Sequence, residues 1–247
     1  MIKQEIAIIS DIHGNSLALK KVLEDINNRG IKTIINLGDS LYGPLDPKGT
    51  FELLQKHNVI SISGNQDRFI RENLSEKTDF ITLEYVKSQI DDKVIEWLNS
   101  LPFDTIYDDK IYCCHASPQN DSIYLLESLE KDYVAIKDKN EIDALLTHVK
   151  QSIVICGHSH VSKIVETDNK LIVNSGSVGL PAYDDDLPIY HKMENYNPYA
   201  NYAILSFYDN SIKVDKIAIK YDSESAAKLA ELNNRDDWAT WIRTGIV

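Results

Sequence analysis

The sequence predicts an α/β fold, a two-sheet β-sandwich flanked by helices, in which the first sheet is mainly parallel and the second is mixed. Two observations predict this fold. Over the first two thirds of the chain, short apolar runs alternate with segments whose apolar residues recur at helical spacing, as in βαβ units. After residue 156 that alternation stops. Pairs of apolar runs separated by short polar turns follow, which is typical of antiparallel hairpins.

The elements of the first two thirds can be assigned in order. The apolar run 5–10 predicts a strand, and the periodic segment Ser16–Asn28 predicts a helix. Asn15 or Ser16 is the expected N-cap of that helix, and Gly30 marks its expected end. The same reasoning predicts further strands at 32–37, 59–63, 110–114 and 152–156, and further helices at 48–57, 78–100 and 124–149.

Two hairpins are expected in the last third of the chain. The first joins 161–166 to 171–175 through the turn Thr167-Asp168-Asn169. The second joins 202–208 to 211–221 through Asp209-Asn210.

The C-terminal tail has helical periodicity over residues 223–243, where Leu229, Leu232 and Trp238 are expected to pack. We see no linker-like stretch. We therefore expect one domain over 1–247, with a loop insertion at about 181–200 and a helical tail at about 223–247.

Composition narrows the class of protein. The net charge of −12 argues against nonspecific binding to nucleic acid, which requires a basic surface. The apolar run at the N-terminus is too short to predict a signal peptide or a membrane span. The 3 cysteines are odd in number and two of them, Cys113 and Cys114, are adjacent, which argues against a disulfide framework and favours a cytoplasmic location.

Five of the apolar runs are followed directly by residues that bind metal ions. The carboxyl ends of parallel strands meet at one edge of a sheet, so we expect these side chains to converge. Each short motif alone is more typical of a turn, but five in series indicate a site. The mixture of imidazole and oxygen donors suits manganese, iron, zinc or nickel. The residues are Asp11, His13, Asp39, Asn65, Asp67, His115, His158 and His160.

The motifs that carry these residues are "SDIHGN", "LGDS", "SGNQDR", "CCHASP" and "CGHSHV". In this order, and over roughly residues 5–208, the chain resembles the calcineurin-like metallophosphoesterases, and the fold this implies is metallo-dependent phosphatase-like. The resemblance implies a centre of two divalent metal ions, with manganese favoured. Asp11, His13 and His160 would hold the first ion, Asn65, His115 and His158 the second, and Asp39 would bridge them.

The activity implied by the resemblance is hydrolysis of a phosphoester by a hydroxide that bridges the two ions. Phosphodiesters, nucleotides and dinucleoside polyphosphates are the implied substrates, and the ions would attract such anions despite the acidic chain. The alternative is an interaction module, because some relatives keep the fold and lose catalysis. Those relatives lose ligand residues, whereas all seven positions here keep a donor, which favours the enzyme.

The sequence departs from the family pattern at Gln66, where many members have a histidine that assists the leaving group. An amide orients a phosphate oxygen but does not donate a proton as a general acid. We therefore expect a preference for substrates whose leaving group departs readily. His191 is a candidate substitute acid, and Asp67 either orients a neighbouring group or only shapes the turn.

Four further residues are candidates for substrate binding, each with a structural alternative. Gly176 and Ser177, in "NSGSVGLP", bring backbone amides to a phosphate or form a tight turn. Arg68 reaches a phosphate or lies on the surface. Tyr183, in the insertion at 181–200, stacks on a ring of the substrate or packs locally.

Overall fold

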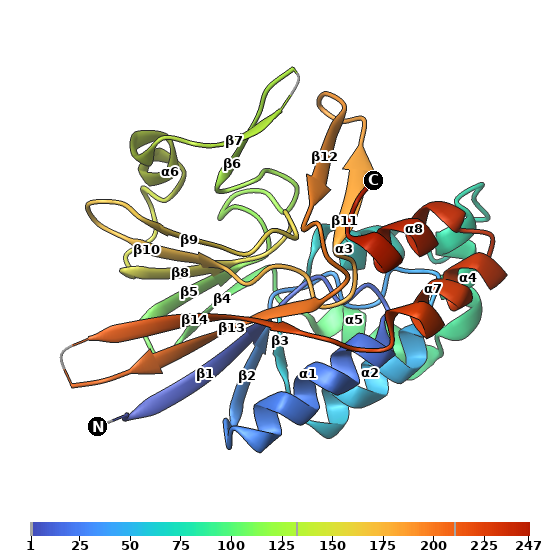
Figure 1. Ribbon diagram of the computed structural model, residues 1–247, viewed down its shortest axis with the longest axis horizontal. Coiled ribbons are helices and arrows are strands. Elements are labelled where there is room, and N and C mark those ends of the chain that lie inside the picture. The colour runs from blue at the N-terminus through green and yellow to red at the C-terminus, as the bar shows by residue number, and fades with distance from the viewer. Residues whose placement is uncertain (1, 132, 210) are drawn as a thin grey trace.

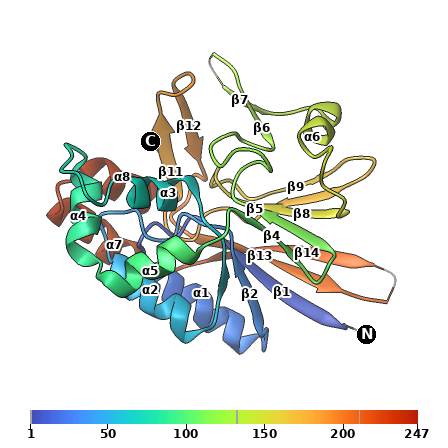
Figure 2. The same ribbon diagram turned by 180° about the vertical axis from the view of Figure 1, so that it is seen from behind.

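The computed structural model describes residues 2–131, 133–209 and 211–247. Two five-stranded sheets pack against each other, as Figures 1 and 2 show from opposite sides, and this confirms the two-sheet α/β sandwich. Helices lie against the outer face of the first sheet and gather at one end of the sandwich, next to the hairpin of β11 (Ala182–Asp185) and β12 (His191–Glu194) (Figure 1).

The first sheet has the strand order β14-β13-β1-β2-β3. β1 (Gln4–Ile9), β2 (Thr33–Asn36) and β3 (Ile60–Ser61) are parallel, as expected from the sequence, although β3 is shorter than the apolar run 59–63. The hairpin of β13 (Ala200–Phe207) and β14 (Ile212–Ile219) joins this sheet antiparallel to β1. Its strands pair as expected, and Asn210 of the expected turn lies outside the described residues.

The second sheet is mixed and has the order β4-β5-β8-β10-β9. Its three central strands are parallel, and its two edge strands are antiparallel to their neighbours. The expected hairpin through Thr167-Asp168-Asn169 forms its β9–β10 edge. The bounds are β4 (Asp104–Tyr107), β5 (Ile111–Cys114), β8 (Ile153–Cys156), β9 (Lys163–Glu166) and β10 (Leu171–Asn174).

The core lies on both faces of the first sheet because successive side chains of a strand point to opposite faces. In β1, Ile6 and Ile8 pack against the second sheet, and Ala7 and Ile9 pack in the layer that contains α1. β1 is therefore buried on both faces, and the loop that follows it is anchored at its start.

Three helices of the first half begin at a capping side chain, that of Asn15, Asp46 or Asp91. α1 (Ser16–Asn28) has the bounds expected from the sequence, and the Asn15 side chain accepts a hydrogen bond from the Ala18 N–H at 3.1 Å. α2 (Pro47–Lys56) and the short α3 (Asn65–Glu72) follow β2 and β3. The segment 78–100 forms two helices, α4 (Ile81–Gln89) and α5 (Asp92–Ser100), because Asp91 caps a new helix at the Val94 N–H.

The expectation of a helix over 124–149 was wrong for most of its length. Residues in this segment form the hairpin of β6 (Glu127–Leu129) and β7 (Val134–Ile136), and only α6 (Lys139–Leu145) is helical. Asp138 starts that helix by accepting the N–H groups of residues 140 and 141. Four consecutive buried residues, 124–127, also break any one-faced helical pattern.

The insertion at 181–200 contains the regular hairpin of β11 (Ala182–Asp185) and β12 (His191–Glu194). The tail forms α7 (Ser223–Leu232) and α8 (Asp236–Thr244), and Trp238 packs in a cluster with Leu180 and Ala182 next to this hairpin. Leu232 does not pack as expected, since it is 77% exposed while alanines form the buried face of α7. In the described part of the chain, we find no helix with the length and apolar character that crossing a bilayer requires.

Candidate metal centre

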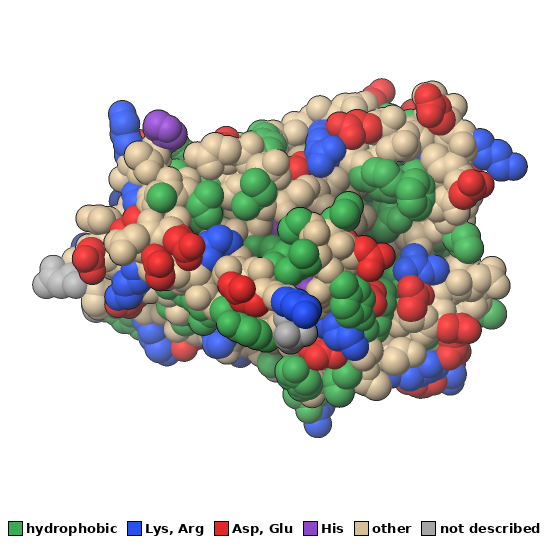
Figure 3. Space-filling view, turned by 90° about the horizontal axis from the view of Figure 1, so that it is seen from above, with side chains coloured by type: hydrophobic (Ala, Val, Ile, Leu, Met, Phe, Trp, Pro, Cys, Tyr) green, Lys and Arg blue, Asp and Glu red, His purple; other side chains and the backbone are tan. Residues whose placement is uncertain are grey.

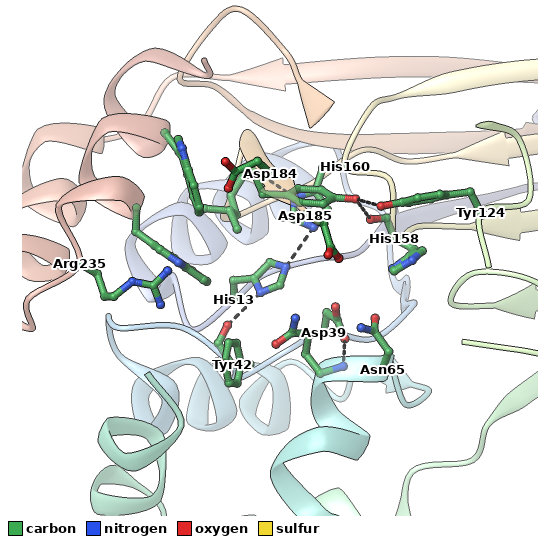
Figure 4. A pocket seen from close by; sticks show the side chains of 15 residues that line it. His13, Asp39, Tyr42, Asn65, Tyr124, His158, His160, Asp184, Asp185 and Arg235 are labelled. Atoms are coloured by element: carbon green, nitrogen blue, oxygen red, sulfur yellow. Dashed lines mark hydrogen bonds between the residues drawn. The ribbon is translucent and has the colours of Figure 1, made fainter. Parts of the chain in front are cut away.

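The seven candidate ligands converge at one end of the sandwich, where they follow strands of both sheets. Figure 4 shows those that line the pocket, which are His13, Asp39, Asn65, His158 and His160. Asp11, His13 and His160 offer ligand atoms that all lie within 4.8 Å of one another, and Asp39, His115 and His158 form a second such cluster. Asn65 joins the second cluster because its Oδ1 lies 2.9 Å from His115 Nε2. Both clusters are largely buried.

The backbone turns sharply at these positions. Five candidate ligands have positive φ angles near the left-handed region, which residues other than glycine rarely adopt. Such strain collects at functional sites, where the surrounding structure holds it in place. The residues and angles are Asp11 (53°), His13 (52°), Asp39 (51°), His158 (68°) and His160 (61°).

The first cluster brings lone pairs face to face. His13 Nδ1 lies 2.9 Å from the Tyr42 carbonyl and His160 Nδ1 lies 2.7 Å from the Leu180 carbonyl, and because a carbonyl only accepts, each Nδ1 carries the hydrogen. Burial and the neighbouring His160 lower the pKa of His13 to about 4, so its Nε2 is an acceptor. The two Nε2 atoms are 3.1 Å apart.

Asp11 completes this cluster. Its Oδ1 is buried without a hydrogen-bond partner and lies 3.5 Å from His160 Nε2. Burial tends to raise the pKa of Asp11, but the surrounding imidazoles hold it well below its usual range, so the carboxylate is ionised. Facing lone pairs and an unpartnered carboxylate oxygen fit a bound cation, which is the partner all of them lack.

The second cluster differs from the first in the protonation of its histidine His115. His115 Nδ1 donates to the Leu37 carbonyl at 2.8 Å, and its Nε2 faces Asn65 Oδ1 and, at 3.4 Å, Asp39 Oδ2. Burial lowers the pKa of His115, but the Asp39 carboxylate more than offsets this and raises it to about 10. A metal ion bound here must displace that proton.

Backbone N–H groups fix the two carboxylates. Asp11 Oδ2 accepts the His158 N–H at 3.0 Å, and Asp39 Oδ1 accepts the Gln66 N–H at 2.8 Å. Gly157 permits the first contact, because a Cβ there would overlap Ser10 Oγ. The loops after different strands are thus locked to one another.

Asp67 is fully buried and joins two of these loops without lining the pocket. Its Oδ1 accepts the Ser40 N–H at 3.0 Å and its Oδ2 accepts the Gly64 N–H at 3.1 Å. Burial and the Asp39 carboxylate raise the pKa of Asp67 to about 7, against the effect of the two N–H groups. Its contacts orient the neighbouring ligand loops, which was one of the two roles considered from the sequence.

A pocket of about 190 Å³ opens over the two clusters (Figure 4). Candidate ligands and Gln66 form its floor, and aromatic residues form much of its wall. In Figure 3, histidine side chains are visible in the hollow at the middle of the face, with hydrophobic and acidic side chains around it. The C-terminal tail supplies Arg235, Trp238 and Trp241, which the sequence analysis did not place at a site.

Comparison with known proteins decides the family. Residues 5–193 match the family model of the calcineurin-like phosphoesterase superfamily domain. The chain belongs to this superfamily. An uncharacterized protein of Methanocaldococcus jannaschii is 30% identical over an alignment of 260 residues, which covers 96% of either chain.

Two crystal structures share the fold of this calcineurin-like phosphoesterase. A metallophosphoesterase from Sphaerobacter thermophilus is 22% identical with a TM-score of 0.76, and covers 98% of this chain and 100% of its own. A hypothetical protein from Pyrococcus horikoshii is 19% identical with a TM-score of 0.75, and covers 98% of both chains. The superfamily is metal-dependent, and the two clusters fit that chemistry.

His191 lies outside the pocket. It is buried, its Nδ1 donates to the Ile189 carbonyl at 2.8 Å, and its Nε2 lies 2.8 Å from the Tyr124 hydroxyl. The Tyr124 ring stacks on His158 with centroids 4.6 Å apart. His191 therefore reaches the centre through Tyr124, and a direct role as the acid finds no support in its position.

Of the four expected substrate contacts, the structure brings only Tyr183 to the pocket, where its ring lies 4.5 Å from that of His160. Arg68 is held by both oxygens of Asp121, at 2.8 and 3.0 Å. The N–H groups of Gly176 and Ser177 already bond to Asn174 Oδ1 and the His160 carbonyl. These three residues support the loops, and they have no free group directed at a phosphate.

Proposed function

We propose that this chain is a phosphoester hydrolase that depends on two divalent metal ions and acts on phosphodiesters, nucleotides or dinucleoside polyphosphates. The observation that carries the proposal is the pair of facing imidazole nitrogens with an unpartnered carboxylate oxygen in the first cluster, next to a second buried cluster of the same kinds of donor. Asp11, His13 and His160 would hold one ion, and Asn65, His115 and His158 the other, with Asp39 between them. Manganese is the favoured metal, and the donor set also suits iron, zinc or nickel.

Bound divalent ions activate water as a nucleophile and neutralise charge on a phosphoryl group. The contribution of the protein is to hold the candidate ligands in a fixed orientation. The Asp39 and Asp11 carboxylates are held by backbone N–H groups, so they keep their orientation when the metal is absent. The rings of Tyr124 and Tyr183 pack on His158 and His160 and restrict access of water from that side.

Gln66 is the side chain best placed to contact the phosphoryl group. It follows Asn65 in the first turn of α3 and lines the pocket. Its amide N–H group binds an oxygen but supplies no acid proton. We therefore propose that substrates with readily departing leaving groups are preferred.

A metal screen tests the proposal. The purified protein would be loaded with manganese, iron, zinc or nickel, its metal content measured, and its hydrolysis of bis-p-nitrophenyl phosphate and nucleotides followed. We expect close to two ions per chain and turnover that Asp39→Asn abolishes. Asp168→Asn, an exposed aspartate in the β9–β10 turn, is the matched control. Turnover that survives Asp39→Asn would contradict the assignment.

The alternative is an interaction module with this fold and weak or no catalysis. Binding to a partner does not require seven donors to converge, and their convergence supports the enzyme. A cytoplasmic location is part of the proposal, since Cys113, Cys114 and Cys156 are buried free thiols.

A further inference from the structure

The rim of the pocket carries two carboxylates from one strand. Asp184 and Asp185 both line the pocket, and in Figure 4 the Asp185 carboxylate is directed into it. The alternation of a strand explains this, because Asp185 shares a face of β11 with Tyr183, whose ring lies against His160. The charge of Asp185 also acts on Tyr124, whose hydroxyl lies 2.6 Å from that of Tyr183; burial first, and Asp185 after it, raise the pKa of Tyr124.

The cation on the rim is already neutralised. Arg235 lines the same pocket, but its Nε and Nη2 bond to Asp237 at 2.9 and 2.6 Å, and its Nη1 bonds to Thr82 Oγ1. Its guanidinium also lies 5.3 Å from the centre of the Trp238 ring. The rim therefore presents two carboxylates and one paired guanidinium, beside an uncharged aromatic wall.

The size of the pocket determines which part of a substrate meets this rim. A volume of about 190 Å³ is below the roughly 300–1,000 Å³ of usual ligand pockets. It accommodates a phosphoryl group and a few more atoms over the candidate metal ligands. The remainder of a larger substrate therefore extends beyond this volume, past a lining that includes Asp184 and Asp185.

We propose that Asp184 and Asp185 select the substrate by charge. Phosphoesters with one phosphoryl group and an uncharged or cationic remainder are accepted, and polyphosphate chains are disfavoured. This inference rests on the proposed function and removes dinucleoside polyphosphates from the favoured substrates. Coulomb's law, at an effective dielectric constant of about 40 and a separation of about 8 Å, gives a factor of roughly five per pair of unit charges.

The test compares two substrates that release the same p-nitrophenolate. One is p-nitrophenyl phosphorylcholine, whose remainder is cationic, and the other is the γ-p-nitrophenyl ester of ATP, whose remainder is polyanionic. In the D184N/D185N variant, the ratio of kcat/KM for the anionic over the cationic substrate should rise at least about tenfold. Amide oxygens preserve the hydrogen bonds that these residues accept from Tyr190 and from the Leu187 N–H.

Asp186→Asn is the matched control. Asp186 is the next residue of the same hairpin, is exposed and does not line the pocket, so Asp186→Asn removes one negative charge from the hairpin, where D184N/D185N removes two, and leaves the pocket lining unchanged. We expect it to leave the substrate ratio within about twofold of the wild type. An equal rise in both variants, or no rise in D184N/D185N, would overturn the inference.

A binding measurement separates this inference from the proposed function. Calorimetry of the metal-loaded protein would compare phosphocholine with 3,3-dimethylbutyl phosphate, which has nearly the same shape and lacks the positive charge. We expect phosphocholine to bind about fivefold or more tightly, and this preference to disappear in D184N/D185N. Equal affinities in the wild type refute the inference. A wild type that hydrolyses no phosphoester refutes the proposed function instead.

Discussion

Metal binding at the second cluster should release a proton from His115. The pKa of this imidazole is raised to about 10 beside Asp39, so at pH 7 only about one molecule in a thousand has it neutral. A metal ion requires the neutral form. The apparent affinity of this site should therefore rise about tenfold per pH unit between about pH 7 and pH 10.

Calorimetry measures that proton directly. Manganese or zinc would be titrated into the metal-free protein at pH 7 in buffers with different ionisation enthalpies, and the slope of heat against ionisation enthalpy gives the protons released. In His115→Asn the total should fall by about one, because the amide ligand carries no exchangeable proton of this kind. His148→Asn, an exposed histidine, should leave the total unchanged.

The same proton makes the stability of the metal-free protein depend on pH. The pKa of His115 in the folded state is above its ordinary value of 6.5, so its stabilising contribution is complete below pH 6.5 and is lost as the pH rises toward 10. Chemical denaturation at pH 6 and pH 9 would show this decrease. Equal proton release by the wild type and His115→Asn would refute the reasoning, because it would show that the imidazole is already neutral.

Three further predictions concern the loops and the pocket floor. Gly157→Ala should destabilise the protein by about 1–3 kcal/mol, because its Cβ overlaps Ser10 Oγ, and thermal unfolding measures the loss. Asp67→Asn places an amide N–H group against the Ser40 or Gly64 N–H, so two donors face each other. Denaturant titration should show that the free energy of unfolding falls by about 1–3 kcal/mol. An unchanged midpoint would count against the role of Asp67 in joining the two loops. Gln66→His should raise kcat/KM for alkyl leaving groups more than for p-nitrophenolate, and a uniform change across a leaving-group series would contradict this.

The sequence predicted best those secondary-structure elements whose pattern has a single physical cause, such as burial on both faces or a helix cap. Strands buried on both faces, such as β1 and β8, read as apolar runs, and α1 has a capping residue and a glycine at its end. The segment 124–149 was harder to predict because its hairpin lies away from the two main sheets and its register depends on contacts made elsewhere. The sheet that β13 and β14 join was also undetermined, since an antiparallel hairpin can add to either one.

The candidate ligands could be predicted because each follows an apolar strand, whereas the wall of the pocket could not. Arg235 and Trp238 lie far along the chain in a helical tail, where an arginine and a tryptophan have no local pattern that distinguishes packing from binding. For His191 the sequence suggested too much. A histidine in the insertion was a candidate general acid, but its contacts place it behind Tyr124. In both cases the role of the residue depends on contacts with distant parts of the chain, which a local sequence pattern does not reveal.

The left-handed backbone at the candidate ligands has a consequence for mutational tolerance. At Asp11, Asp39 and His158, glycine and asparagine suit the backbone even though they change the chemistry, while valine and isoleucine meet steric conflict at Cβ. In a saturation library scored for soluble expression in the absence of metal, glycine and asparagine variants should therefore be retained, and valine and isoleucine variants should be depleted. The residues tolerated at these positions would then depend on the backbone conformation as well as on the metal ions that the site is proposed to bind.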